Sequence, residues 1–480
     1  MNGRMVARIL GLVLLTLAGL LLLPLLVGLI YRERVMGFLA AALLCAAIGG
    51  LLLLFKPKSR EIFAKEGFTA VGLTWTVMSL LGALPFVING SIPNYIDAVF
   101  ETASGLTTTG ASILNNCELL PHADQFWRIF THWLGGMGVL VFVMAVLPMS
   151  ESRAMHIMRA EMPGPTVGKL VPRARKTALI LYLTYAGLTV VEAVLLMFGG
   201  MSFFEALLHA FATAGTGGFS TRAASIGGFQ SLYIEMVIAV FLVLFGINFN
   251  LYYFVLIGRI KEALKSEELH VYFALIGVSV LAIALGITKM YGGFATALRH
   301  AFFNTMSIVS TAGFGTVDFT TWPDYCQSIL VILMFIGGCA GSTGGGLKLS
   351  RVMLLVKTAV ADVQRMVSPR RVTRIELDGR RVSQETASAV YTYFALYMLL
   401  LIACMFIVSF DGYDFATNFT AALSCMSNVG PGLGRISPAG NFAIFSPLSK
   451  ITMTLTMLFG RLEIYAMLIL FIPSTWRKRS

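Results

Sequence analysis

Four short stretches of the sequence combine glycine with small hydroxyl or amide residues, and each lies between long apolar runs. The first reads SGLTTTGAS, and an ungapped alignment gives DAVFETASGLTTTG, EALLHAFATAGTGG, HAFFNTMSIVSTAG and TNFTAALSCMSNVG. Glycine permits the positive φ angles that turn carbonyl oxygens inward, and a ring of carbonyl oxygens can replace the hydration shell of a cation. The glycines that end these segments are Gly110, Gly218, Gly313 and Gly430.

These segments predict the four parts of an ion selectivity filter. Each follows a short amphipathic segment, which we expect to be a helix whose C-terminal end points toward the membrane centre. Such an end carries about half a negative charge, so four of them favour a cation between them. The predicted filter residues are Thr108, Thr109, Gly110, Thr216, Gly217, Gly218, Thr311, Ala312, Gly313, Asn428, Val429 and Gly430.

A second pattern is GGCAGSTGGGLK, which runs from Gly337 to Lys348 inside an apolar stretch. Each glycine would cost a continuous helix about 0.8–1 kcal/mol relative to alanine, so we expect the helix to break here. A small-residue packing face is the alternative, but it does not explain three successive glycines. A flexible loop below the filter could block the path of the ion. Its central residues are Gly341, Ser342, Thr343, Gly344, Gly345 and Gly346.

Arg461 lies inside the last apolar run, where a charged side chain costs roughly 2.5–3.5 kcal/mol on insertion scales and usually faces a cavity or a partner. Glu463 is only two residues away, so the two side chains point to different helix faces. We expect Arg461 to face the pore, to bond carbonyl groups of the glycine-rich loop and to repel cations there.

Weaker signals come from single polar residues. Seven acidic residues near the expected outer side could enrich cations or could be ordinary solvated charges. Three further residues, His132, Asn248 and Asn250, are expected to form hydrogen bonds between helices. The acidic residues are Asp97, Glu101, Glu205, Asp318, Asp324, Asp411 and Asp414.

The composition indicates an integral membrane protein. Of the 480 residues, 57% are hydrophobic and 12% are charged, whereas soluble domains carry about a quarter charged residues. Apolar runs long enough to cross a bilayer as helices recur, and alternating barrel strands are absent from the pattern. The net charge of +12 fits basic cytoplasmic loops and does not imply nucleic acid. We find no catalytic triad, metal cluster or phosphate loop, so an enzyme is not expected.

Ten membrane spans are predicted. Most Lys and Arg residues fall in the segments on one side, which places both termini in the cytoplasm. The predicted spans are 8–30, 36–55, 67–89, 126–149, 177–199, 232–257, 270–290, 326–359 (interrupted), 386–410 and 445–473.

The order of span, re-entrant helix, glycine segment and span recurs four times, which predicts an all-α membrane fold of four M1–P–M2 repeats around one pore. A re-entrant segment is tolerated in a membrane where protein buries it or water lines it. Two additional N-terminal helices precede the repeats. The expected boundaries are 1–60 for the helix pair and 61–155, 170–262, 266–365 and 380–480 for the repeats.

The glycine segments, the layout of the spans and the length resemble those of the TrkH/KtrB superfamily of potassium transport proteins. The strongest signatures are SGLTTTGAS, GTGGFST, STAGFGT, SNVGPG and the glycine-rich stretch. The leading helix pair is similar to the TrkH branch. The resemblance implies K⁺ as the transported ion, a gating loop at 341–346, and a pore arginine at the position of Arg461. Glycine at all four filter positions implies potassium preference, since related plant transporters with serine in the first position prefer sodium.

The resemblance also implies the cellular setting. It implies inward K⁺ movement across the bacterial inner membrane, a homodimer, and cytoplasmic TrkA-like subunits that bind nucleotide, while this chain has no organic cofactor. Two alternatives remain open. One is a sodium-permeable member of the same family, and the other is a secondary transporter of a small organic solute, although such folds usually contain inverted repeats.

Overall fold

The protein is almost entirely helical, as the sequence predicts. The computed structural model describes residues 2–55, 64–138, 174–369 and 374–476. The strands of the described chain form one two-residue antiparallel hairpin, in which Glu376 pairs with Arg381. The elements outside the main helices are α14 (Ile260–Ala263), α23 (Pro473–Trp476), β1 (Glu376–Leu377) and β2 (Arg380–Arg381).

Four units share one order: a first helix, a shorter re-entrant helix, and a second helix. Side-chain caps begin several re-entrant helices; Asn94, for example, accepts hydrogen bonds from the amides of Ile96 and Asp97. In the first two units the helices are α4 (Ala64–Gly82), α5 (Leu84–Asn89), α6 (Tyr95–Leu106) and α7 (His122–Gly136), then α10 (Ala174–Phe198), α11 (Phe203–Ala214), α12 (Leu232–Gly246) and α13 (Phe249–Leu256).

The third and fourth units follow the same order. Short 3₁₀ helices lie in the connections: η1 (Cys117–Leu119), η2 (Ser225–Phe229), η3 (Phe319–Thr321), η4 (Ser409–Asp411), η5 (Gly434–Ile436) and η6 (Phe442–Ile444). The main helices are α15 (Glu267–Ile287), α16 (Phe294–Val309), α17 (Asp324–Ile336) and α18 (Leu349–Val367), then α19 (Gln384–Val408), α20 (Phe415–Ser427), α21 (Pro447–Arg461) and α22 (Tyr465–Phe471).

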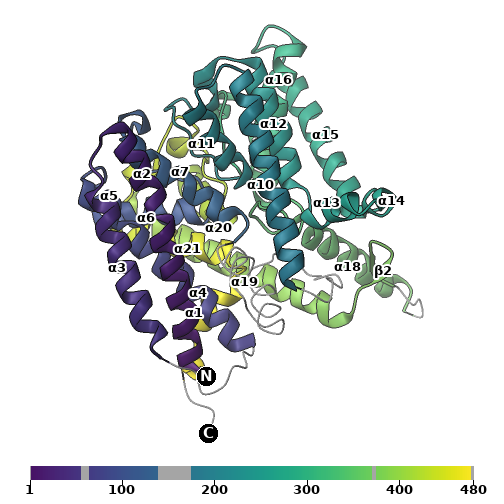
Figure 1. Cartoon of the computed structure of the whole chain (residues 1–480). Coiled ribbons are helices and arrows are strands. Elements are labelled where there is room, and N and C mark those ends of the chain that lie inside the picture. Colours follow the sequence, from purple (N-terminus) through teal and green to yellow (C-terminus); the bar gives the residue numbers. More distant parts are fainter. Residues whose placement is uncertain (1, 56–63, 139–173, 370–373, 477–480) are drawn as a thin grey trace.

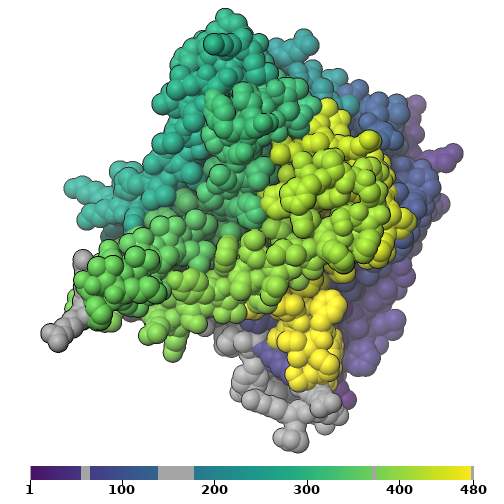
Figure 2. Space-filling view, turned by 180° about the vertical axis from the view of Figure 1, so that it is seen from behind, coloured from purple at the N-terminus to yellow at the C-terminus, as the bar shows by residue number. Residues whose placement is uncertain are grey.

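The units are arranged in a closed cycle. The second helix of each unit packs against the re-entrant helix of the next: α7 against α11, α12 against α16, and α17 against α20. The cycle closes because α21 of the fourth unit packs against α6 of the first. Seen from behind, the fourth unit, coloured yellow-green to yellow, lies between the green third unit and the blue first unit (Figure 2). The predicted arrangement of four repeats around one axis is therefore confirmed.

The N-terminal helices α1 (Gly3–Leu20), α2 (Leu22–Tyr31) and α3 (Met36–Leu53) lie at one side of this cycle (Figure 1). Glycines allow the backbones of α1 and α3 to approach closely, which is a common packing device between membrane helices. A Cβ added at Gly11 would lie 2.8 Å from the Gly49 carbonyl oxygen, and one at Gly49 would lie 2.9 Å from that of Gly11.

Both ends of the described chain lie at the same end of the molecule (Figure 1). The amide of Asn2 donates to Glu66 Oε1 at 3.2 Å, and Lys65 Nζ donates to the Ser474 carbonyl oxygen at 2.8 Å.

The second helices of the last three units are broken, which the sequence predicts only for the third unit. In that unit α17 ends at Ile336 and α18 begins at Leu349, so the predicted interruption is confirmed. The predicted continuous span 232–257 is wrong, because α12 and α13 meet at an angle of 89°. The predicted continuous span 445–473 is also wrong, because Glu463 and Ile464 adopt positive φ angles of 54° and 64° between α21 and α22.

Six described helices are long and apolar enough to cross a membrane, or seven if the bent α12–α13 pair is one span. The breaks shorten the other second helices, and the second half of the predicted fourth span lies outside the described residues. The count of ten spans therefore stays a prediction.

The contact between α1 and α3 gives a first testable prediction. We expect Gly11→Val to lower the melting temperature of the detergent-solubilised protein, because overpacking of a close contact costs about 1–3 kcal/mol. Differential scanning fluorimetry measures the shift. Gly19→Val in the same helix is the matched control, since a Cβ there meets nothing within 4 Å. Equal melting temperatures for the two variants would contradict the close packing.

Candidate functional site

A left-handed residue turns the chain after each re-entrant helix. Non-glycine residues rarely adopt positive φ, yet the residue two positions before the filter glycine does so in all four units. The angles are 54° at Thr108, 52° at Thr216, 63° at Thr311 and 55° at Asn428. The glycines that follow also have positive φ, from 78° at Gly110 to 100° at Gly430. The sequence predicts the second reversal but not the first.

The residue between these two reversals is held in the same way in each unit. Its amide donates to a carbonyl oxygen of the re-entrant helix five residues earlier, in a helix-ending bond of the Schellman kind. With the amide directed at the helix, the carbonyl oxygen of the same residue is available on the other side. The bonds run from Thr109 to Ser104 at 2.9 Å, Gly217 to Ala212 at 2.8 Å, Ala312 to Ser307 at 2.8 Å and Val429 to Ser424 at 3.0 Å.

The four segments meet in a closed ring. A Cβ added at Gly110 would lie closer than 3.0 Å to the carbonyl oxygen of Gly217, and one at Gly218 would lie equally close to that of Ala312. The same holds for Gly313 against Val429, and the ring closes from Gly430 to Thr109. Each of these four positions therefore requires glycine, because any side chain would displace a carbonyl oxygen of the next segment.

The predicted filter residues are thus brought together, and the four glycines line one open cavity that contains about 760 Å³ of empty space. Next to this ring, Thr108 Oγ1 and Asn428 Oδ1 are buried without a hydrogen-bond partner among the described residues. Buried polar atoms are normally satisfied, so oxygens of this kind are suited to an ion or to water.

The glycine-rich loop, residues 337–348, packs directly against the inner end of the filter segments. The amide of Gly345 donates to Thr311 Oγ1 at 2.6 Å, and a Cβ at Gly344 would lie 2.7 Å from the Ser310 carbonyl oxygen. On its other side the loop lines a second cavity, of about 790 Å³ of empty space, together with Arg461. The two cavities share no lining residue, so the loop and the filter separate them.

The glycine-rich loop lies against the break between α12 and α13. The last carbonyl groups of α12 lack helical partners, and the loop supplies them: Cys339 donates to Gly246 at 3.0 Å, and Thr343 Oγ1 donates to Phe245 at 3.2 Å. Asn248 does not join two helices as predicted but caps α13, accepting a bond of 3.0 Å from the amide of Asn250.

Arg461 joins the loop to the end of α7. Its guanidinium donates to the carbonyl oxygens of Thr343 and Gly136, each at 2.8 Å, and also to that of Gly135. The predicted bond to the loop is confirmed, and Glu463 pairs instead with Arg351. The bonds to α7 were not predicted, because the sequence does not reveal that α7 ends at this level.

Two charged residues of the loop region were also missed. Glu268, near the start of α15, accepts hydrogen bonds from the amides of Ala340 at 2.7 Å and Ser350 at 3.1 Å. Lys348 is buried and donates to the Gly344 carbonyl oxygen. A carboxylate thus holds the loop at Ala340 and the start of α18 at Ser350, and an ammonium group holds the middle of the loop. In the sequence, the one feature that points to the role of Glu268 is the position of an acidic residue at the start of a predicted span.

The acidic residues predicted at the outer mouth have more specific roles. Glu101 is buried and is paired with Arg128, so it is neither solvated nor free to attract cations. Asp97 pairs with Lys450 at 2.7 Å, and Asp414 caps α20 through Thr417. The predicted interhelical role of His132 is confirmed, because its Nδ1 contacts the Gly105 carbonyl oxygen on α6 at 2.9 Å.

Comparisons with known proteins agree with this geometry. A family model described as a cation transport protein, TrkH, matches residues 35–478. The chain is 40% identical to the Trk system potassium uptake protein TrkH of Salmonella typhimurium over 488 residues, with 100% of both chains covered. It is 36% identical to the protein of that name from Halomonas elongata, again over 100% of both. The crystal structure of the potassium transporter TrkH from Vibrio parahaemolyticus superimposes with a TM-score of 0.90 at 35% identity, covering 99% of this chain and 100% of that one.

The two hydrogen bonds that Glu268 accepts are expected to limit the mobility of the loop. We expect Glu268→Ala to increase thiol labelling of Cys339, which is buried in the loop, by at least about tenfold, because each of the two lost bonds to a charged group is worth about 1.5–3 kcal/mol. Mass spectrometry of peptides after timed labelling measures the rate, with buried Cys404 as the internal reference.

Glu267→Ala is the matched control, because the Glu267 side chain pairs with Lys357 and not with the loop. An equal labelling rate for the two variants would show that Glu268 does not hold the loop.

Proposed function

Because this chain belongs to the TrkH family of cation transport proteins, we propose that it conducts potassium ions inward across a bacterial plasma membrane. The observation that carries the proposal is the closed ring of filter segments. The two relatives and the crystal structure compared above are potassium uptake or transport proteins, and the family model describes cation transport proteins, which are not enzymes.

The ring has the chemistry that a monovalent cation requires. The carbonyl oxygens of Thr109, Gly217, Ala312 and Val429 replace part of the hydration shell, as carbonyl rings do in potassium filters. The re-entrant helices end at this ring, and their C-terminal ends add partial negative charge. Because none of the twelve predicted filter residues is a carboxylate, the ion is held weakly enough to move on.

The glycine-rich loop is the gate of the proposed pathway. It lies between the two cavities, it contacts Thr311 of the filter, and its residues 341–346 have no regular helix to lose when they move. Arg461 places a positive charge beside the loop and bonds it to α7. In the closed position this charge repels cations and stabilises the loop.

The proposed setting follows from the family and from charge. The chain lies in the inner membrane with both termini in the cytoplasm, and its repeats extend over 61–155, 170–262, 266–365 and 380–480 after the N-terminal pair 1–60. It forms a homodimer, and cytoplasmic TrkA-like nucleotide-binding subunits regulate the gate from the basic inner side. The printed names of the relatives refer to a Trk system, which supports association with other components.

The filter assignment is tested by Gly110→Ser. The added side chain must displace the Gly217 carbonyl oxygen, so we expect the K⁺/Na⁺ permeability ratio to fall about tenfold, which corresponds to about 1.4 kcal/mol. Reversal potentials in proteoliposomes with opposing K⁺ and Na⁺ gradients measure the ratio. Gly90→Ser, where a Cβ meets nothing within 4 Å and φ is equally positive, is the control. An unchanged ratio in Gly110→Ser would contradict the filter.

The gate assignment is tested by Arg461→Ala. Loss of its bonds to the loop and to α7 removes about 1.5–3 kcal/mol per charged hydrogen bond, so basal ⁸⁶Rb⁺ uptake into vesicles should rise by at least about tenfold. Arg259→Ala is the control, because Arg259 is largely exposed and pairs only locally with Glu262 among the described residues. Uptake at the control level in Arg461→Ala would remove this residue from the gate.

A further inference from the structure

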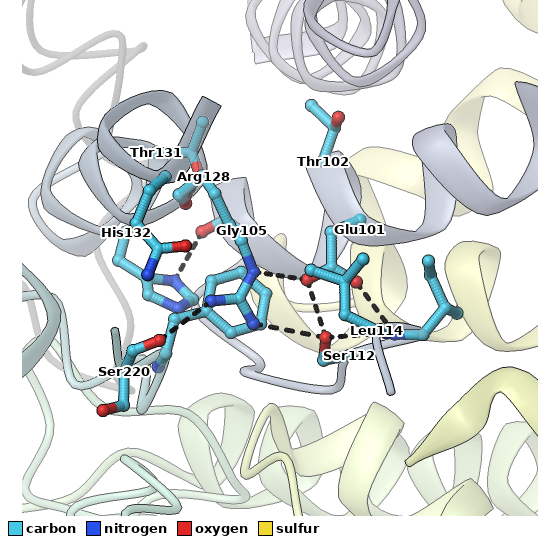
Figure 3. A network of polar contacts seen from close by, with 12 residues as sticks. Glu101, Thr102, Gly105, Ser112, Leu114, Arg128, Thr131, His132 and Ser220 are labelled. Carbon is cyan, nitrogen blue, oxygen red and sulfur yellow. Dashed lines mark hydrogen bonds and ion pairs between the residues drawn. The ribbon is translucent and has the colours of Figure 1, made fainter. Parts of the chain in front are cut away.

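An ion pair lies buried beside the filter. Arg128 Nε on α7 lies 2.6 Å from Glu101 Oε1 on α6, and the two side chains are 4% and 0% exposed. The guanidinium lies between Glu101 and Ser112 on one side and Ser220 on the other (Figure 3). Buried pairs of this kind carry a large desolvation cost, so hydrophobic packing of similar size would often serve stability as well.

The pair contacts the outer ends of two filter segments. Glu101 Oε2 accepts from the Ile113 amide at 2.9 Å and Oε1 accepts from Ser112 Oγ at 2.8 Å, three and two residues after the first filter glycine. Arg128 donates to Ser112 Oγ at 3.2 Å and to the Ser220 carbonyl oxygen at 3.3 Å. The chain after Gly110 and the chain after Gly218 are therefore held to one guanidinium.

The same face of α7 strengthens this connection. The Arg128 Cζ atom lies 3.6 Å from the centre of the Phe219 ring, which is within the range of a cation–π interaction. One turn further on, His132 Nε2 accepts from the Phe219 amide at 3.3 Å while its Nδ1 contacts the Gly105 carbonyl oxygen. Two side chains of α7 thus position the outer end of the second segment relative to the first.

The fourfold alignment shows that Glu101 occupies a special position. The corresponding residue of the second unit, His209, contacts Ser220 Oγ at 2.9 Å, and that of the third unit, Asn304, donates to Thr316 Oγ1 at 3.3 Å. The fourth unit has Ala421 there. In three units, therefore, a side chain of the re-entrant helix forms a hydrogen bond with a hydroxyl residue that follows the filter glycine. In this alignment only the first unit has a charged side chain, Glu101, in that role.

The Arg128 guanidinium also faces the outer cavity, which is the entrance to the filter. Arg128 lines the outer cavity together with all four filter glycines. A lone guanidinium at this place would repel an incoming cation, and a lone carboxylate would attract it. With both present, the entrance gains a rigid support without a net charge.

We propose that Glu101 and Arg128 are positioning residues for selectivity: the pair fixes the spacing between the first and second filter segments, and Glu101 neutralises the arginine that the support requires. The inference rests on the proposed function of the filter. It differs from a purely structural role because it ties two measurable properties, selectivity and conductance, to different features of the pair.

The experiment measures single-channel currents and reversal potentials of the full chain in bilayers with K⁺ and Na⁺, for Glu101→Gln, Arg128→Gln and Arg128→Lys. All three should lower the K⁺/Na⁺ permeability ratio roughly three- to tenfold, because a nearby unit charge or its fixed geometry is altered. At low ionic strength Glu101→Gln should lower K⁺ conductance and Arg128→Gln should raise it. Near 1 M salt, where the screening length is about 3 Å, these conductance changes should vanish.

Arg128→Lys separates position from charge. Lysine keeps the charge but lacks the planar fork that reaches Glu101, Ser112 and Ser220 together, so its conductance should stay near the wild-type value while its selectivity falls. This variant also decides the matter if the two neutralising variants fail to yield monodisperse protein.

The Glu235–Arg299 pair provides the matched control. Arg299 binds Glu235 through two bonds of 2.6 Å, and neither residue lines the outer cavity. Glu235→Gln and Arg299→Gln should leave the permeability ratio unchanged. A wild-type ratio in the folded Glu101 and Arg128 variants would overturn the proposal. If Gly110→Ser still alters selectivity in that case, the filter stands and this proposal alone fails; if the wild-type chain passes no K⁺, both fail.

Discussion

The structure depends on one constraint, which is that backbone carbonyl groups must converge inside a membrane without hydrogen-bond partners of their own. Backbone polar groups in the bilayer core are normally satisfied within helices. Each filter segment meets this constraint by a helix-ending bond that fixes its amide, as from Thr109 to Ser104, and by two backbone reversals. The free carbonyl side of the segment then rests against the glycine of its neighbour. No segment can hold this conformation alone, because each glycine contacts the next segment of the ring.

The cycle of four units explains why the second helices break. Each of them ends beside the filter segments or the glycine-rich loop. Under the proposed function, a helix that continued there would occupy the path of the ion. In the described chain α7 ends at Gly136, α12 at Gly246, α17 at Ile336 and α21 at Arg461. The freed carbonyl groups then bind across the units: those of α12 accept from the glycine-rich loop, and those of α7 accept from Arg461. Among the described residues, the loop is the insertion that breaks the fourfold pattern, and it lies where these helix ends leave room.

The sequence is enough to predict the fold class, the four segments and the loop, because glycine spacing and apolar length report local requirements directly. Gly110 and its three counterparts are recognisable since no other residue tolerates both the φ angle and the close neighbour. The breaks after Gly246 and Arg461 are not recognisable, because their local sequence is compatible with a helix and tertiary bonds decide the outcome. The same holds for Glu101 and Glu268. An acidic residue near a span end suggests solvent contact. Only the assembled structure shows that Glu101 pairs with Arg128 and that Glu268 accepts from one amide of the loop and one of α18.

The central claim is that the carbonyl oxygens of Thr109, Gly217, Ala312 and Val429 bind a monovalent cation on the axis of the four units. Anomalous diffraction from crystals grown with Rb⁺ in place of K⁺ tests this claim directly. We expect an anomalous peak surrounded by these four oxygens, which diminishes when K⁺ is added in excess and is lost in Gly110→Ser. A Rb⁺ peak at another place, with none inside the ring, would contradict it.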